Sequence, residues 1–184
     1  MPTARSLTAA APLGNGIAGV FGGNSSSSSQ LQTNEVYSYA TNTWSTKAPM
    51  PTARTALAAA PLGDGIAGVF GGNSSSSSQL QTNEVYSYAT NTWSTKAPMP
   101  TARAYLAAAP LGDGIAGVFG GSSSAGFLQT NEVYSYATNT WSTKAPMPTA
   151  RGLTAAAPLG DGIAGVFGGS GGGIQDVNEI YSYG

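Results

Sequence analysis

The chain has 184 residues, of which 41% are hydrophobic and only 8% are charged, whereas roughly 25% of the residues in an average soluble domain are charged. Its net charge of −1 leaves no basic surplus to neutralise phosphates, which argues against nucleic acid and anionic membranes as partners. Cys and His are absent, so the sequence excludes disulfides, cysteine nucleophiles and the usual zinc, copper and haem ligand sets.

Four strands are predicted in the first 49 residues. In chain order they cover residues 6–12, 17–22, 34–39 and 43–47. Gly14-Asn15-Gly16 between the first two strands favours a type I′ hairpin, whose central residues need a positive φ. Residues 23–33 are rich in Ser and are predicted to form a flexible loop. Pro49 and Pro51 end the fourth strand because proline cannot donate to a strand ladder, and no helix is expected.

The same unit recurs four times. Equivalent arginines, spaced by 49, 49 and 48 residues, stand at Arg5, Arg54, Arg103 and Arg151. A repeat of this length buries its apolar faces only against its neighbours, so we predict one domain over residues 1–184. Its repeats cover about 1–49, 50–98, 99–146 and 147–184. The Ala-rich start recurs internally and no apolar run approaches the roughly 18 residues of a membrane span, so we expect neither a signal peptide nor a transmembrane segment, and the compartment stays unknown.

Residue size increases along each unit. The first strand carries Ala9, Ala10 and Ala11, whereas the large Tyr37 and Trp44 come in the third and fourth strands. Blades of a propeller converge at the axis and separate at the rim, so small residues belong inside. This order predicts a propeller whose first strands line the axis.

A Gly pair closes the second strand of each unit, and Tyr37 and Trp44 follow it with six residues between them. With the P-M-P-T-A-R segment before each first strand, this pattern resembles the kelch repeat over essentially the whole chain. The resemblance implies an all-β fold, a β-propeller of four-stranded antiparallel blades, four per chain, in which the last blade lacks its outer strand. It gives structural roles to Gly22, Gly23, Tyr37, Trp44, Gly71, Gly72, Tyr86, Trp93, Gly120, Gly121, Tyr134, Trp141, Gly168, Gly169 and Tyr181. The chain departs from the family at Ser38-Tyr39, where Asp-Pro is frequent, and in its last copy, which lacks the Trp strand.

Two motifs that could indicate a ligand site are explained more simply by turns between strands. Residues 14–19 match G-x-G-x-x-G, but a dinucleotide site needs a following helix, and here a strand follows. The motif also recurs in every unit, so we interpret it as a hairpin. Asp64, Asp113 and Asp161 lie in these turns, one per unit, where a Ca²⁺ loop would need several clustered oxygen ligands.

The top face of the predicted propeller carries the loops after the second strands and the entries to the first strands. The units differ mainly on this face, and variable loops on a rigid scaffold commonly carry binding sites. The candidate ligand-binding residues are therefore Arg5, Arg54, Arg103, Arg151, Tyr105 and Phe127. Two alternatives stay open: each arginine forms a structural ion pair with the Glu of its own unit, and the loops vary only by drift.

The sequence predicts a non-enzymatic binding or assembly scaffold that uses this top face to hold a protein, a peptide or a small polar ligand. The glutamates lie near the top and the turn aspartates at the bottom, so they cannot form an acid–base pair. No cofactor or metal is expected. The alternatives are a kelch-type carbohydrate-active enzyme, such as an oxidase or epimerase, and a duplicated or designed scaffold without a ligand. Because the last unit leaves an edge strand, we also expect a homo-oligomer, a dimer that closes an eight-bladed ring.

Overall fold

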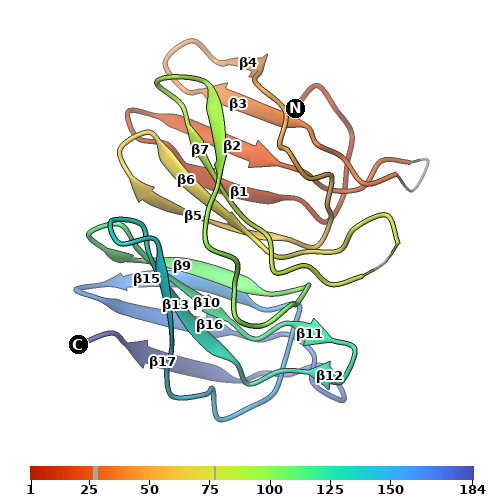
Figure 1. Ribbon diagram of the computed structural model, residues 1–184, viewed down its shortest axis with the longest axis vertical. Coiled ribbons are helices and arrows are strands. Elements are labelled where there is room, and N and C mark those ends of the chain that lie inside the picture. Colours follow the sequence, from red (N-terminus) through yellow and green to blue (C-terminus); the bar gives the residue numbers. More distant parts are fainter. Residues whose placement is uncertain (27–28, 77) are drawn as a thin grey trace.

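The computed structural model describes residues 1–26, 29–76 and 78–184 (Figure 1). Ser27, Ser28 and Ser77, which belong to two of the predicted loops, lie outside the described residues. All regular elements in these ranges are β-strands, and they form four antiparallel blades of a β-propeller. The all-β prediction is confirmed.

Three blades have four strands and the last has three. Blade 1 contains β1 (Ala9–Pro12), β2 (Ile17–Phe21), β3 (Asn34–Ser38) and β4 (Thr43–Thr46). Blade 2 contains β5 (Ala58–Gly63), β6 (Ile66–Phe70), β7 (Asn83–Ser87) and β8 (Thr92–Thr95). Blade 3 contains β9 (Ala107–Gly112), β10 (Ile115–Phe119), β13 (Asn131–Ser135) and β14 (Thr140–Thr143). Blade 4 contains β15 (Ala155–Gly160), β16 (Ile163–Phe167) and β17 (Asn178–Ser182), and a small hairpin of β11 (Ser122–Ser123) and β12 (Gly126–Phe127) lies in a loop of blade 3.

The first strand of each blade begins later than predicted. In blade 1 it begins at Ala9 rather than Ser6, because Leu7 has a φ of 53° and interrupts the extended backbone. Ser6 instead forms an isolated bridge with Asn24. The residues equivalent to Leu7 also have positive φ: Ala56, Tyr105 and Leu153.

The hairpin between the first two strands has the predicted turn. Asn15 and Gly16 have φ of 49° and 71°, and the amide of Ile17 donates to the carbonyl of Gly14 at 2.8 Å. Two central residues with positive φ define a type I′ turn, which matches the twist of the strands that it joins. The glycine fingerprint is therefore a turn between strands.

The blades follow one another through their innermost strands. β1 contacts β5, β5 contacts β9, and β9 contacts β15. In Figure 1 the blades succeed one another from blade 1 at the top to blade 4 at the bottom. The alanine-rich strands therefore line the inside, in agreement with the predicted size gradient.

Each blade has two faces that pack differently. We call the face that packs on the next blade in the chain the trailing face; in blade 1 it carries Leu13, Phe21 and Val36. We call the opposite face, which packs on the preceding blade, the leading face; in blade 2 it carries Val69 and Tyr86, with Trp93 at the rim. Phe21 lies edge-on to Tyr86 and Trp93, with ring centroids 6.1 and 5.6 Å apart. The same arrangement of rings recurs where Phe70 meets blade 3.

Candidate interaction surfaces

An ion pair lies inside each blade. Nη2 of Arg54 lies 2.8 Å from Oε2 of Glu84, and both side chains are buried. Arg54 also donates to the backbone carbonyls of Val69 and Gly71, and the Thr52 hydroxyl donates to the second carboxylate oxygen of Glu84. The guanidinium group therefore joins the linker, β6 and β7 within one blade.

All four repeats contain this pair. The partners are Arg5 with Glu35, Arg54 with Glu84, Arg103 with Glu132 and Arg151 with Glu179, at distances of 2.8 to 3.0 Å. Desolvation lowers the pKa of Arg54 to about 10, against the opposing effect of Glu84, and it also lowers the pKa of Arg5 and Arg103. The arginine side chains are buried in these pairs, so their geometry is that of the structural ion pair predicted as an alternative to ligand binding. They offer no guanidinium group on the top surface.

The other two candidates from the top face lie in different surroundings. Tyr105 is half-buried, and its amide donates to the carbonyl of Ala56 in the neighbouring blade at 2.8 Å. Phe127, on β12, is 40% exposed. It lines a hollow of about 550 Å³ with the linker residues Pro146 and Ala150. Phe127 is thus the candidate that a partner can reach.

A hollow also lies among the turns at the bottom of the propeller. It has a volume of about 500 Å³ and is lined by turn residues of blades 1 to 3, among them Gly14, Asp64 and Asp113. Within residues 1–26, 29–76 and 78–184, no three Asp, Glu, Cys or His residues are grouped so that they could hold a metal ion. The turn aspartates lie at the opposite end of the blade from the paired glutamates, as the sequence predicts.

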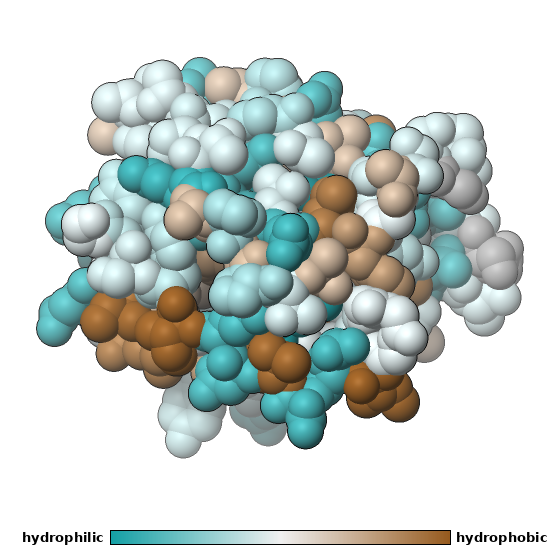
Figure 2. All heavy atoms as spheres, turned by 90° about the horizontal axis from the view of Figure 1, so that it is seen from below, coloured by the Kyte–Doolittle hydropathy of each residue, from teal (hydrophilic) through white to brown (hydrophobic). Residues whose placement is uncertain are grey.

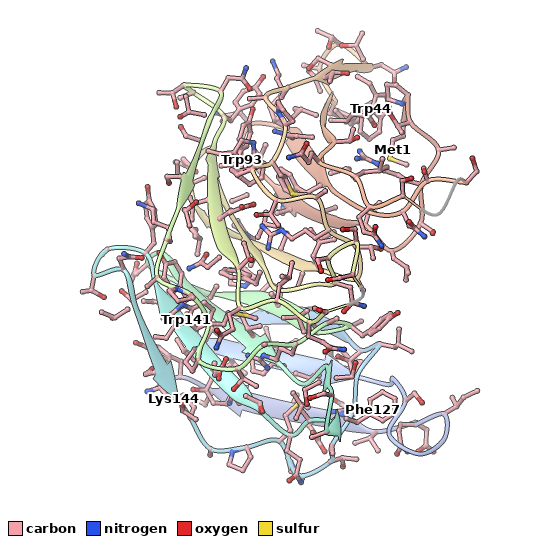
Figure 3. The ribbon with its side chains drawn as sticks, turned by 45° about the vertical axis from the view of Figure 1, so that its right-hand side comes forward. Met1, Trp44, Trp93, Phe127, Trp141 and Lys144 are labelled. Carbon is pink, nitrogen blue, oxygen red and sulfur yellow. The ribbon has the colours of Figure 1, made fainter. Side chains whose placement is uncertain are left out.

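The three tryptophans are not equivalent. Trp93 and Trp141 each lie against the Phe of the preceding blade, and their indole nitrogens donate to the carbonyls of Ala48 and Ala97 at 2.8 Å. Trp44 contacts only Tyr37 of its own blade, at 5.2 Å, among the ring contacts of the described residues. Figure 3 shows Trp44 and Met1 at the blade 1 end of the molecule.

The trailing face of blade 4 is uncovered. Phe167 is 36% exposed, whereas its three equivalents, Phe21, Phe70 and Phe119, are fully buried. Leu159 and Ile180 are 52% and 60% exposed, although the matching residues of the other blades are buried. Figure 2, which views this side of the molecule, shows hydrophobic groups separated by polar side chains.

The leading face of blade 1 is also less covered than its counterparts. Val20 and Tyr37 are half-buried, whereas the equivalent Val69 and Tyr86 in blade 2 are fully buried. Tyr39 is 79% exposed. The equivalent Tyr88 and Tyr136 each lie under a lysine of the preceding blade. Blades 1 and 4 therefore each present one face of a repeated interface.

A family model, the KLHDC2/KLHL20/DRC7 Kelch-repeats domain, matches residues 8–184. The chain belongs to the kelch-repeat family. None of the curated proteins matches it. The family assignment confirms the kelch resemblance, and the kelch propeller fold supports a general role as a protein-binding scaffold.

Kelch-repeat domains are generally non-enzymatic and generally bind proteins. In the part of the chain that the structure describes, there is no helix that is both long and apolar enough to cross a membrane. Leu159, Phe167 and Ile180, which form an exposed apolar surface, are not among the binding residues predicted from the sequence. The sequence did contain a signal for this surface. The fourth repeat keeps the apolar residues that the first three repeats bury against a following blade.

Proposed function

We propose that this kelch protein is a non-enzymatic binding and assembly module, in which the trailing face of blade 4 packs on the leading face of blade 1 of a second copy. The observation that carries the proposal is the exposure of Phe167 at 36%, where three equivalent phenylalanines are fully buried. An exposed apolar surface of this kind commonly marks an interaction site.

The internal interfaces describe what the junction would contain. Phe21 and Phe70 each pack on a Tyr and a Trp of the next blade. By the same relation, Phe167 would pack on Tyr37 and Trp44 of the second copy. Aromatic pairs in edge-to-face geometry add stability beyond the area that they bury.

Backbone groups support the same junction. The amide of Gly23 donates to the carbonyl of Arg54 at 2.9 Å, and the amide of Ala56 donates to the carbonyl of Leu7 at 3.0 Å. Equivalent bonds join blade 2 to blade 3 and blade 3 to blade 4. Between two copies, they would run from Gly169 to Arg5 and from Leu7 to Leu153.

Two such junctions would close a ring. Each chain supplies one trailing face and one leading face, so a two-fold pair buries both kinds of free face at once and forms eight blades. Eight blades lie within the usual range of about four to eight for propellers.

A top-face site for a protein or peptide is the second candidate. It is supported by Phe127, which is 40% exposed and lines the hollow of about 550 Å³. A small polar ligand at the arginines has less support, because these guanidinium groups are buried in ion pairs. A carbohydrate-active enzyme has less support because the glutamates are occupied by these pairs. The turn aspartates Asp64, Asp113 and Asp161 lie at the other end of the blades.

One pair of variants tests both candidates. Phe167→Glu should reduce the mass measured by light scattering from twice 18.4 kDa to a single 18.4 kDa chain. Phe127→Glu places the same charge on a similarly exposed residue of another face and should leave the dimer intact. If the unsubstituted protein stays a single chain up to millimolar concentration, the assembly proposal is wrong.

Peptides selected from a random library for binding to the unsubstituted protein can be tested on the same two variants. Their affinities show which of the two surfaces each peptide binds. Peptides that bind the top face should lose affinity for the Phe127→Glu variant and keep it for the Phe167→Glu variant. If the affinity of the selected peptides is unchanged by the Phe127→Glu substitution, the support for the top-face site is lost.

A further inference from the structure

The top face carries the same hollow on blade 1 and on blade 3. Its volume is about 500 Å³ in blade 1 and about 550 Å³ in blade 3. Residues 31–34 and 128–131, which line the two hollows, share the sequence L-Q-T-N. The linker to the next blade completes each wall, with Pro49 in blade 1 and Pro146 in blade 3. The two hollows therefore occupy equivalent places in the repeat.

One lining residue distinguishes the two hollows. Gln30 bridges Asn24 in blade 1, and Phe127 pairs with Ser122 at the equivalent position of blade 3. Gln30 is half-buried, whereas Phe127 is 40% exposed. An exposed aromatic ring contributes favourable free energy when a partner covers it. Blade 3 therefore offers an apolar contact that blade 1 lacks.

The backbone of Phe127 is also available to a partner. The amide and carbonyl of Ser122 exchange hydrogen bonds with Ala104 at 2.7 and 3.0 Å. A residue in an antiparallel ladder directs both groups to one side, so Ser122 and Phe127 form a pair without hydrogen bonds. The amide and carbonyl of Phe127 therefore point away from β11, and β12 pairs with no other strand among the described residues. This edge of the hollow offers one donor and one acceptor to an extended chain.

A lysine lies at the other end of the blade 3 hollow. Figure 3 shows Phe127 and Lys144 on opposite sides of the lower part of the molecule, so the hollow that both residues line is elongated. The amide of Lys144 donates to the carbonyl of Asn131 at 2.9 Å. Asn131 stands four residues after Phe127, which corresponds to about 13 Å of extended chain. The hollow therefore has the length of a short peptide strand.

The charge of this lysine has no acidic partner in the chain. Glu132 also lines the hollow, but its carboxylate is paired with Arg103 at 2.8 Å. The four ion pairs of the described residues do not include Lys144, whose Nζ lies 5.0 Å from the ring centroid of Tyr183. A partner with a carboxylate at this end would be electrostatically complementary to the hollow.

We propose that the blade 3 hollow binds an extended segment of another protein that carries an apolar residue and an acidic residue four positions apart. The proposal rests on the proposed top-face site and specifies its partner. The apolar side chain packs on Phe127, the carboxylate meets Lys144, and the backbone pairs with Phe127 as in strand addition. Residues four positions apart lie on the same face of an extended chain, so both side chains can enter the hollow together.

The probes are two dye-labelled synthetic peptides of identical composition, S-D-T-S-T-W-T-S and S-T-W-T-S-T-D-S. They place the acid and the indole four positions apart in opposite chain directions, and fluorescence anisotropy follows their binding. We expect saturable binding of at least one peptide, weakened roughly tenfold when its tryptophan is replaced by alanine. Equal affinity of the tryptophan and alanine forms, or no saturation of either probe up to about 1 mM, would overturn the proposal.

The two equivalent hollows allow a test by exchange of one residue. Phe127→Gln gives blade 3 the residue of blade 1 and should weaken binding of the probe roughly tenfold. Addition of Gln30→Phe to this variant moves the ring to the blade 1 hollow and should restore most of the lost affinity. If the double variant binds no better than Phe127→Gln alone, the ring does not select the hollow and the proposal is wrong.

The lysines of the two hollows provide a matched pair for the carboxylate contact. Lys144→Met should weaken binding of the probe to the unsubstituted hollow roughly threefold and reduce its dependence on salt concentration. Lys47→Met makes the same change in the blade 1 hollow and should leave the affinity unchanged. Equal effects of both substitutions would show that the charge does not act within the blade 3 hollow, and the proposed carboxylate contact would be wrong.

The outcomes separate this proposal from the top-face site on which it rests. If peptides from the random library lose affinity for the Phe127→Glu variant but neither probe binds, the top-face site stands and the proposed segment is wrong. If neither the library peptides nor the probes respond to substitution of Phe127, both proposals fail. If Phe127→Gln changes the mass measured by light scattering without peptide, the occupant is a second copy, which also overturns the proposal.

Discussion

The junction between blades 2 and 3 and the free faces of blades 1 and 4 are built from the same residues in different surroundings. Phe70 is fully buried against Tyr134 and Trp141, whereas Phe167 is 36% exposed. Equivalent phenylalanines in near-identical repeats therefore differ in their exposed fraction, and the difference comes from the presence or absence of a neighbouring blade. Each repeat therefore buries its apolar face only where another blade packs on it, and in repeat architectures such contacts between neighbours supply much of the stability.

The largest expected effect comes from the buried ion pairs. Arg103→Ala should lower the free energy of unfolding by about 3–5 kcal/mol, because it leaves the Glu132 carboxylate buried without its partner. Arg151→Ala in the terminal blade should cost less, since the side chain of Glu179 is 12% exposed against 1% for Glu132. Urea unfolding measures both. Equal costs would contradict the distinction between inner and terminal blades.

The phenylalanines test the same comparison through packing. Phe70→Ala should lower the free energy of unfolding by about 3–5 kcal/mol, as for other buried aromatic residues. Phe167→Ala should cost less than about 1 kcal/mol at dilutions where light scattering shows single chains, because little of its packing is present there. A cost for Phe167→Ala that matches Phe70→Ala in single chains would mean that blade 4 is already covered.

The tryptophans at the rim differ in the same way between inner and terminal blades. Trp93→Ala removes contacts with Phe21 and Tyr86 and a hydrogen bond to Ala48, so we expect a loss of about 3 kcal/mol. Trp44→Ala removes its ring contact with Tyr37, and we expect about 1 kcal/mol. Thermal melts at equal protein concentration would reveal the order. A larger loss for Trp44 would show that it packs between blades.

The smallest expected effect concerns the lysines at the blade junctions. Nζ of Lys96 lies 5.4 Å from the ring centroid of Tyr136, and Lys96→Met should cost about 0.5–1 kcal/mol. Tyr39 in blade 1 has no such lysine among the described residues and is 79% exposed. Tyr39→Leu should therefore leave the urea midpoint of the single chain unchanged, and a clear shift would contradict this account.

The sequence predicted the blades because the local signals agree with one another. The hairpin at Asn15-Gly16, the alanine-rich first strands and the paired glycines each favour the same strand order. The late start of β1 was missed because a Leu at position 7 carries no visible signal for a positive φ.

The candidate site was harder to predict. The arginines were recognised as either ligand-binding or ion-paired, and only the structure places Arg54 2.8 Å from Glu84 and buries both. The exposure of Phe167 depends on whether another blade packs on the trailing face of blade 4. That information exists only once the blades are arranged in space.

In the proposed dimer, blade 4 of one copy meets blade 1 of another as consecutive blades meet within the chain. Because the chain has no cysteine, Leu7→Cys with Leu153→Cys introduces a specific pair, and both positions are exposed. Leu7→Cys with Ala56→Cys is the internal control, since the amide of Ala56 donates to the carbonyl of Leu7 at 3.0 Å. Oxidation should join the first variant into a covalent species of twice 18.4 kDa and leave the control at 18.4 kDa with its thiols consumed. If the control oxidises while the first variant stays at 18.4 kDa, with its thiols free or joined within one chain, the account is contradicted.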